Sequence, residues 1–215
     1  MSDPTNRPIT IDDPLTPCRH EEGLTRVGLL KGTAAAGGVL AAGALLVGGL
    51  SKPAVSKPSA VQDERVFEWL LEVEQLQAGF YTEVRQRGAL RGELRELAER
   101  VGEQERAHVD ALARALGRSR ARRPEFDFGE ATSDPQRFPG AALELEELGL
   151  AAINGQVPNL TKRRILLVMG IASVEARHVG WLRDLAGLNP APRPADAPAT
   201  QDETRAAIEE TGFTS

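Results

Sequence analysis

The 215-residue chain has a single cysteine, Cys18, and aromatic residues make up only 4% of it. One cysteine excludes an intramolecular disulfide framework and any metal cage built of thiolates. The scarcity of aromatics, beside abundant Leu, Ala, Glu and Arg, favours helices over strands. The net charge is only −5 and the sequence has no long basic stripe, so we expect no nucleic-acid partner.

Charge is also missing from residues 32–51, a run rich in Ala, Gly and Leu between two lysines. The run is barely long enough to span a bilayer, which takes about 20 residues, and its composition is ordinary for the apolar part of an export signal. Residues 25–31 look like a twin-arginine export motif in which Val27 replaces the second arginine. We therefore expect residues 1–60 to be an export signal, or an uncleaved membrane anchor, followed by a linker. Either reading exports the folded part across the cytoplasmic membrane.

Four stretches carry apolar residues at three- and four-residue spacing and are predicted to be helices. They cover residues 62–87, 90–116 and 139–156, and a fourth that runs from just after Asn159 or Thr161 to Ala186. Short links join the first to the second and the third to the fourth, whereas about two dozen residues separate the second from the third. The predicted fold is therefore all-α: a four-helix bundle over residues 61–188 with one long crossover between the second and third helices.

Residues 189–215 are rich in proline, alanine and charge, without an apolar face of useful length. We expect a flexible tail with one helical turn near residues 205–210. The sequence does not determine the oligomeric state, and a homodimer is among the states that it allows.

Two of the three histidines follow a glutamate by three residues, as Glu105–His108 and Glu175–His178. Residues i and i+3 of a helix project from one face, so each pair offers a carboxylate and an imidazole to a single point. Roughly 30 residues before each pair lies another glutamate, Glu74 in the first half and Glu146 in the second. Two such halves would bring four carboxylates and two imidazoles together in the core, as in a di-iron or di-manganese carboxylate site.

The surroundings of these residues support the same interpretation. Glu175 lies in an otherwise apolar stripe with Val168, Ala172 and Leu182. Because unpaired charges are costly to bury, a bound cation is the natural explanation. On the third helix the pattern leaves a choice, since Glu144 and Glu147 compete with Glu146 for the ligand position.

Four segments resemble the helices of the ferritin-like family: residues 74–81 (EQLQAGFY), 105–109 (ERAHV), 145–149 (LEELG) and 174–178 (VEARH). The closest similarity is to the branch found in exported bacterial and desiccation- or stress-related proteins. The loop fragment 126–129 (FDFG) also resembles that branch, and the match covers nearly all of residues 61–188. Asn154 departs from the pattern, because an aromatic residue often stands there.

This resemblance implies a carboxylate-bridged dinuclear site with Glu146 as the ligand from the third helix. The expected ligands are then Glu74, Glu105, His108, Glu146, Glu175 and His178. The expected cofactor is a pair of iron ions, or alternatively a pair of manganese ions, with oxygen or peroxide as the reaction partner. Such a centre would act as a ferroxidase- or peroxidase-like oxidoreductase, or as a manganese catalase, in stress protection of the cell envelope. The alternative is a non-catalytic stress or desiccation protein whose metal site is structural.

Overall fold

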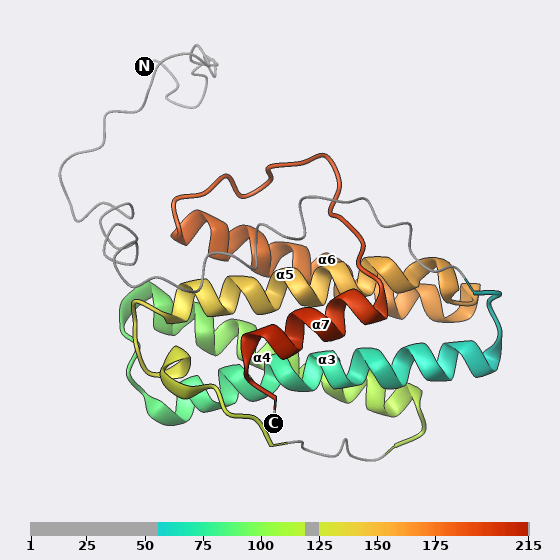
Figure 1. Cartoon of the computed structure of the whole chain (residues 1–215), viewed down its shortest axis with the longest axis horizontal. Helices are drawn as coiled ribbons and strands as arrows, with labels where there is room; N and C mark the ends of the chain where they lie inside the picture. The colour runs from blue at the N-terminus through green and yellow to red at the C-terminus, as the bar shows by residue number, and fades with distance from the viewer. Residues whose placement is uncertain (1–55, 119–124, 215) are drawn as a thin grey trace, which may run out of the picture.

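A computed structural model describes residues 56–118 and 125–214 of the chain, and this part is helical without strands. Its α-helices are α3 (Ala60–Arg87), α4 (Gly92–Ala115), α5 (Phe138–Gln156), α6 (Lys162–Leu185) and α7 (Gln201–Thr211). Two short 3-10 helices, η2 (Gly129–Thr132) and η3 (Val157–Asn159), flank α5. The first four α-helices lie side by side along the long axis of the molecule (Figure 1). The predicted all-α bundle is confirmed, with each helix within about two residues of its expected ends.

Local chemistry explains where the first helix begins and ends. Ser59 precedes α3 in an extended conformation, and its hydroxyl accepts a hydrogen bond from the Gln62 N–H at 3.1 Å. Gly88 follows α3 in the left-handed conformation, with φ of 61°, and its N–H donates to the Val84 carbonyl. A polar N-cap and a left-handed glycine are the usual signals for the two ends of a helix.

The connection from α4 to α5 crosses the bundle and is fastened to α3. In its described part, the Phe128 ring is buried and packs edge-on against Phe80 of α3, with centroids 5.4 Å apart. Thr132 of η2 is also buried, and its hydroxyl donates to the Glu83 carboxylate at 2.8 Å. This connection lets α3 and α4 pair as one hairpin and α5 and α6 as another, the arrangement expected of a bundle with one long crossover.

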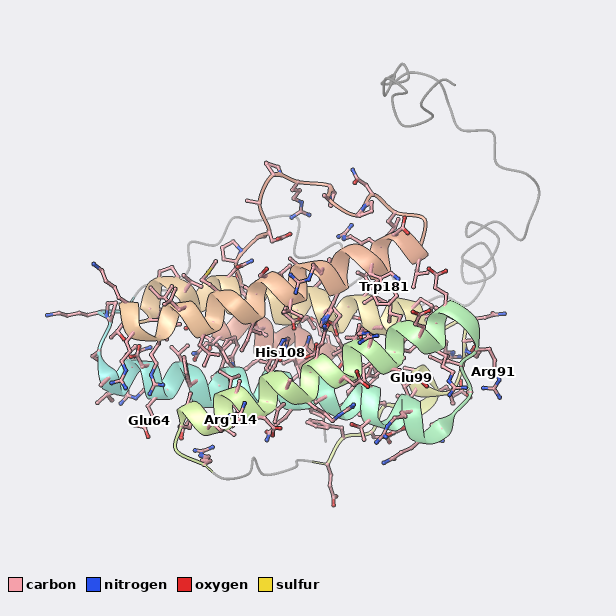
Figure 2. All side chains as sticks on the ribbon, turned by 180° about the vertical axis from the view of Figure 1, so that it is seen from behind. Glu64, Arg91, Glu99, His108, Arg114 and Trp181 are labelled. Carbon is pink, nitrogen blue, oxygen red and sulfur yellow. The ribbon has the colours of Figure 1, made fainter. Side chains whose placement is uncertain are left out.

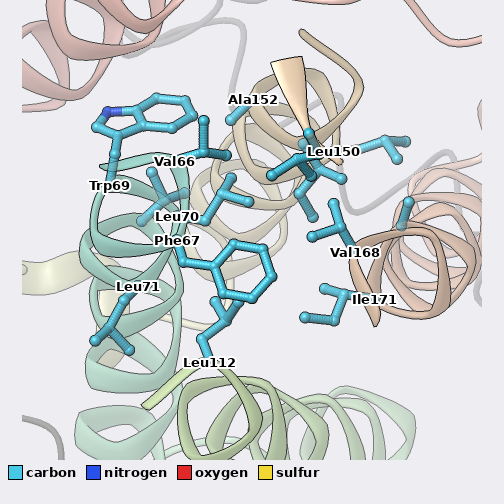
Figure 3. Packing of buried hydrophobic residues seen from close by; sticks show 14 of the residues in the cluster. Val66, Phe67, Trp69, Leu70, Leu71, Leu112, Leu150, Ala152, Val168 and Ile171 are labelled. Carbon is cyan, nitrogen blue, oxygen red and sulfur yellow. The ribbon is translucent and has the colours of Figure 1, made fainter. Parts of the chain in front are cut away.

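The apolar core consists of two clusters, one toward each end of the bundle. Figure 3 shows the first, in which Phe67 and Leu70 of α3 face Leu112, Val168 and Ile171 from other helices. The second cluster continues along the same helices and includes residues such as Phe80, Leu97 and Leu182. Side chains in both clusters are almost fully buried. The bundle therefore has a dry apolar layer on either side of its middle.

The C-terminal segment differs from its prediction as a flexible tail with one helical turn. Residues 201–211 form α7, which lies along α5 on one side of the bundle (Figure 1). Thr200 and Glu203 make a reciprocal capping box at its start. Just before it, the Ala199 N–H donates to the Ala151 carbonyl of α5 at 2.9 Å. The prediction was wrong because the segment is held by this backbone hydrogen bond and by two isolated apolar side chains, Ile208 and Phe213, which pack on the core without forming an apolar stripe.

The predicted export signal or anchor, including residues 32–51, lies outside the described residues. Within the described part of the chain, α6 is long and apolar enough to cross a membrane by length and composition alone. The same helix packs on α5 and carries buried Glu175 and His178. Its composition therefore suits a bundle helix that lines a polar centre.

Candidate metal centre

Six side chains meet midway along the bundle, between the two apolar clusters. They are Glu74 of α3, Glu105 and His108 of α4, Glu146 of α5, and Glu175 and His178 of α6. We refer to these six residues as the carboxylate–imidazole cluster. The labelled His108 marks its position in Figure 2, where it lies in the middle of the bundle. None of the six is more than 7% exposed. The structure thus brings together every ligand residue expected from the sequence.

The cluster divides into two groups of four side chains, and within each group the ligand atoms lie within 4.8 Å of one another. One group comprises Glu74, Glu105, His108 and Glu175, and the other comprises Glu105, Glu146, Glu175 and His178. Glu105 and Glu175 belong to both groups, and we call them the shared glutamates. Two neighbouring four-ligand groups joined by two carboxylates are suited to two metal ions bridged by those carboxylates.

Both imidazoles direct Nδ1 at the carboxylates. His108 Nδ1 lies 3.1 Å from Glu74 Oε2, and His178 Nδ1 lies 2.9 Å from Glu146 Oε2. The two rings are 6.3 Å apart between centroids. Glu74 is therefore paired with His108, and Glu146 is paired with His178. The two halves of the cluster are thus related by the approximate two-fold pattern that the sequence already shows.

Hydrogen bonding within the cluster is incomplete. Among the described residues, the buried side-chain atoms without a hydrogen-bond partner are Gln77 Oε1, Tyr81 Oη, both Glu105 oxygens, Glu146 Oε1 and Glu175 Oε1. Glu105 Oε1 is 3.1 Å from His178 Nδ1 but is not aligned for a hydrogen bond. Buried polar atoms are normally paired, and each exception calls for an explanation such as a bound ion. Because four of these atoms are carboxylate oxygens of the cluster, the donor set fits hard divalent or trivalent cations.

Burial and mutual repulsion change the proton affinities of the cluster. Burial, and then the charge of Glu146, raise the pKa of Glu105 well above its usual range. The pKa of Glu175 is raised in the same way, by burial and then by the charge of Glu105. Burial opposes the charged form of His108, but the three carboxylates around its ring, those of Glu105, Glu175 and Glu74, outweigh burial and raise the pKa to about 12. Without a metal, the cluster therefore holds protons that cations would displace.

Three further side chains surround the cluster, and one of them was missed from the sequence. Gln77 Nε2 donates to Glu175 Oε2 at 3.2 Å, and the Tyr81 ring is buried beside it on α3. Burial and the charge of Glu146 raise the pKa of the Tyr81 hydroxyl, so this phenol stays neutral. Gln104 was not predicted, although its Oε1 lies 2.6 Å from His178 Nε2. Its position four residues before His108, on the same helical face, was the available signal.

The choice among the glutamates of α5 is also answered by their contacts. Glu146 is completely buried and points into the cluster. Glu147 instead pairs with the Arg183 guanidinium of α6, and the half-buried Glu144 has no ring nitrogen beside it in the described structure. Glu146 is therefore the glutamate of this helix that can share a metal ion with His178.

Comparison with known families agrees with this geometry. Residues 62–188, more than half of the chain, match the family model of the ferritin-like domain. The matched range begins in the first turns of α3 and ends just after α6, so it contains the whole carboxylate–imidazole cluster. No curated protein shows significant similarity to the chain.

Proposed function

Because the chain belongs to the ferritin-like family, we propose that its carboxylate–imidazole cluster binds two iron ions and oxidises ferrous iron with oxygen or peroxide as the acceptor. The observation that carries the proposal is that, in the part of the chain that the structure describes, the buried carboxylate oxygens without hydrogen bonds all belong to this one cluster. Leaving a buried polar atom unpaired costs about 1–3 kcal/mol. Two cations bound between the shared glutamates would satisfy these atoms together.

The residues of the chain bind the metal ions and exclude bulk water from them. Carboxylates are hard ligands that favour the oxidised state of iron, and neutral imidazole nitrogen suits iron or manganese. The apolar clusters on both sides keep bulk water from the centre, which strengthens electrostatic interactions there. When bound, the two iron ions would supply electron transfer. Oxidation of two ferrous ions releases two electrons, which with two protons reduce dioxygen to hydrogen peroxide, or reduce hydrogen peroxide to two water molecules.

Oxygen consumption tests this reaction. The metal-free protein is loaded with ferrous iron under anaerobic conditions, and oxygen uptake is recorded after air is admitted. We expect uptake in proportion to protein, with ferric absorbance rising in step. The Glu105→Ala variant, which removes a ligand of both groups, should show only the rate of buffer. Glu103→Gln is the matched control on the same helix, because its side chain is 64% exposed. Turnover at the buffer rate in the unsubstituted protein, with iron bound, would contradict the proposal.

A manganese centre would differ in its products. Peroxide dismutation converts two molecules of hydrogen peroxide to two of water and one of oxygen, so oxygen would be evolved without iron. The donor set of carboxylates and imidazoles suits manganese as well as iron. Loading with each metal separately, followed by addition of peroxide, distinguishes the two reactions.

A structural role for the metal is the second candidate, and the burial of the cluster favours it. Four carboxylates lie in the middle of the core, so their repulsion would be relieved by cations whether or not any reaction follows. In that case chelation should lower the melting temperature by several degrees while iron and peroxide give no turnover. Binding of metal and turnover are therefore measured on the same preparation.

We also propose that the protein acts outside the cytoplasm, in protection of the cell envelope against stress. The support is the uncharged run of residues 32–51 behind a twin-arginine-like motif. Fractionation of cells that express the full chain tests this location. Recovery of the protein in the cytoplasm alone would contradict it.

A further inference from the structure

The two halves of the carboxylate–imidazole cluster have matching ligands but unequal surroundings. Gln104 directly precedes the shared Glu105 on α4, and its Oε1 lies 2.6 Å from His178 Nε2. The corresponding residue of the other half is Val174, which directly precedes the shared Glu175 on α6. Valine has no side-chain acceptor, and among the described residues the side-chain hydrogen bond of His108 is made by Nδ1, whereas His178 makes one with each ring nitrogen. Within the described structure, only His178 therefore has a side-chain hydrogen bond at Nε2, the ring nitrogen that faces away from the carboxylates.

A second difference lies at the opposite side of the cluster. Gln77 stands three residues after Glu74 on α3, and Gly149 stands three residues after Glu146 on α5. A Cβ atom at Gly149 would lie 2.6 Å from the Gln77 Nε2, so the glycine provides the space that the glutamine amide fills. Among the described residues, that amide donates to the Glu175 carboxylate and to no other carboxylate of the cluster. The pseudo-two-fold symmetry of the ligands is thus broken by two pairs of uncharged residues that differ between the halves, Gln104 and Val174 in one pair and Gln77 and Gly149 in the other.

The contact with Gln104 has a definite chemical consequence for His178. An amide oxygen only accepts hydrogen bonds, so Nε2 of His178 must carry the proton. In the neutral imidazole the lone pair is then on Nδ1, which faces Glu146 at 2.9 Å and Glu105 at 3.1 Å. The hydrogen bond fixes both the tautomer and the orientation of the ring. Partners of this kind behind a metal ligand typically change metal affinity by about 10–100-fold.

We propose that Gln104 is a positioning residue that makes the two metal positions unequal. The position formed by Glu105, Glu146, Glu175 and His178 fills first, and the position that contains His108 fills second and more weakly. This inference rests on the proposed dinuclear centre and adds an order of loading to it. An unequal centre gives a protein with one retained ion and one exchangeable ion.

Calorimetric titration of the metal-free full-length protein with Mn²⁺ tests the proposal, together with the electron paramagnetic resonance spectrum after each addition. We expect two binding steps that differ at least about tenfold in affinity. At one Mn²⁺ per chain the spectrum should be that of an isolated ion. His108→Ala should keep the tighter step and lose the weaker one, whereas His178→Ala should lose the tighter step.

Three variants distinguish an effect of Gln104 on the orientation of His178 from an effect on the stability of the fold. Gln104→Leu removes the acceptor at a half-buried site and should weaken the first step about 10–100-fold, so that coupled ion pairs form already at one Mn²⁺ per chain. Gln104→Glu keeps an acceptor and should restore the order of filling. Val174→Gln offers an acceptor in the other half and should tighten the second step. The melting temperature of each chelated variant serves as the check on folding.

Two outcomes would overturn the inference: equal affinities in the unsubstituted protein, or two unchanged steps in Gln104→Leu. Either of these leaves the dinuclear centre itself intact, because two ions are still bound. Failure of the unsubstituted protein to bind Mn²⁺ or ferrous iron would overturn the proposed centre, and the order of filling with it.

Discussion

Replacement of a shared glutamate by its amide should affect stability in opposite directions with and without metal. Glu105 is completely buried, and neither of its oxygens has an aligned hydrogen-bond partner. Its pKa is raised by burial and by the charge of Glu146. At neutral pH this carboxyl is ionised in the unfolded chain, so folding must either bury its charge or protonate it, and both reduce the stability of the folded state. Glu105→Gln has nearly the same shape and no charge, and its amide N–H groups can donate to neighbouring carboxylates. In chelator the variant should therefore be more stable than the natural chain.

The magnitude follows from the unpaired groups. An unsatisfied buried polar group costs about 1–3 kcal/mol, and 1 kcal/mol shifts the melting temperature of a domain of this size by about 2–4 °C. Glu105→Gln should thus melt roughly 2–12 °C higher in chelator. With metal at about 100 times the dissociation constant of each position, each ion adds about 2.7 kcal/mol to the unsubstituted protein, and the two together add about 5.4 kcal/mol. The variant lacks a ligand of both positions and should not receive this gain, so the order of the two melting temperatures reverses.

Thermal unfolding followed by far-UV circular dichroism, in chelator and in excess Mn²⁺, measures both effects. Glu103→Gln is the control, because this exposed neighbour on α4 should change stability by no more than about 0.5 kcal/mol. A Glu105→Gln protein that melts lower than the natural chain in chelator would refute the reasoning. It would mean that Glu105 makes stabilising contacts of its own and that the cluster is an ordinary buried polar network.

Three further predictions concern pH and packing. The raised pKa values of the shared glutamates mean that stability in chelator falls as pH rises above the ordinary value of 4.5. Thermal melts from pH 5 to 8 should show this fall, with a shallower slope in Glu105→Gln; stability rising with pH would contradict it. Gly149→Ala should displace the Gln77 amide from the Glu175 carboxylate and weaken Mn²⁺ binding measurably in calorimetry, with the helix content unchanged. Unchanged affinity would show that Gln77 does not position the carboxylate. Gly155→Ala would place a methyl group in steric overlap with the Ala199 carbonyl oxygen, so α7 should detach, with faster proteolysis near residue 199 and little loss of metal. An unchanged proteolysis rate would count against this packing.

The four long helices and the six residues of the carboxylate–imidazole cluster could be predicted because both depend on local spacing. Glutamate and histidine at i and i+3 share a helical face whatever the rest of the fold does, and Gly88 and Gly117 mark helix ends by their own conformational freedom. The similar separations of Glu74 from Glu105 and of Glu146 from Glu175, each roughly 30 residues, then implied two equivalent hairpins. Only the choice of Glu146 over its neighbours needed more than spacing, and the resemblance to a family supplied it.

The remaining features depend on contacts between distant segments. Gln104 lies on the same face of α4 as His108, but its role comes from a hydrogen bond to His178 of α6, and spacing within α4 does not identify that partner. The docking of α7 rests on the close approach of the Ala199 backbone to Gly155, and a glycine in a helix does not reveal what will approach it. One local signal was nevertheless present in that segment, because Thr200 and Glu203 have the spacing of a capping box.

The metal content of the purified full-length protein, beside a His108→Ala, His178→Ala double variant, tests the central claim most directly. Elemental analysis after loading should find about two iron or manganese ions per chain, as two four-ligand groups require, and the double variant should lose them. A protein that folds as a helical bundle, yet contains no metal and takes up none when iron and manganese are offered, would contradict the account.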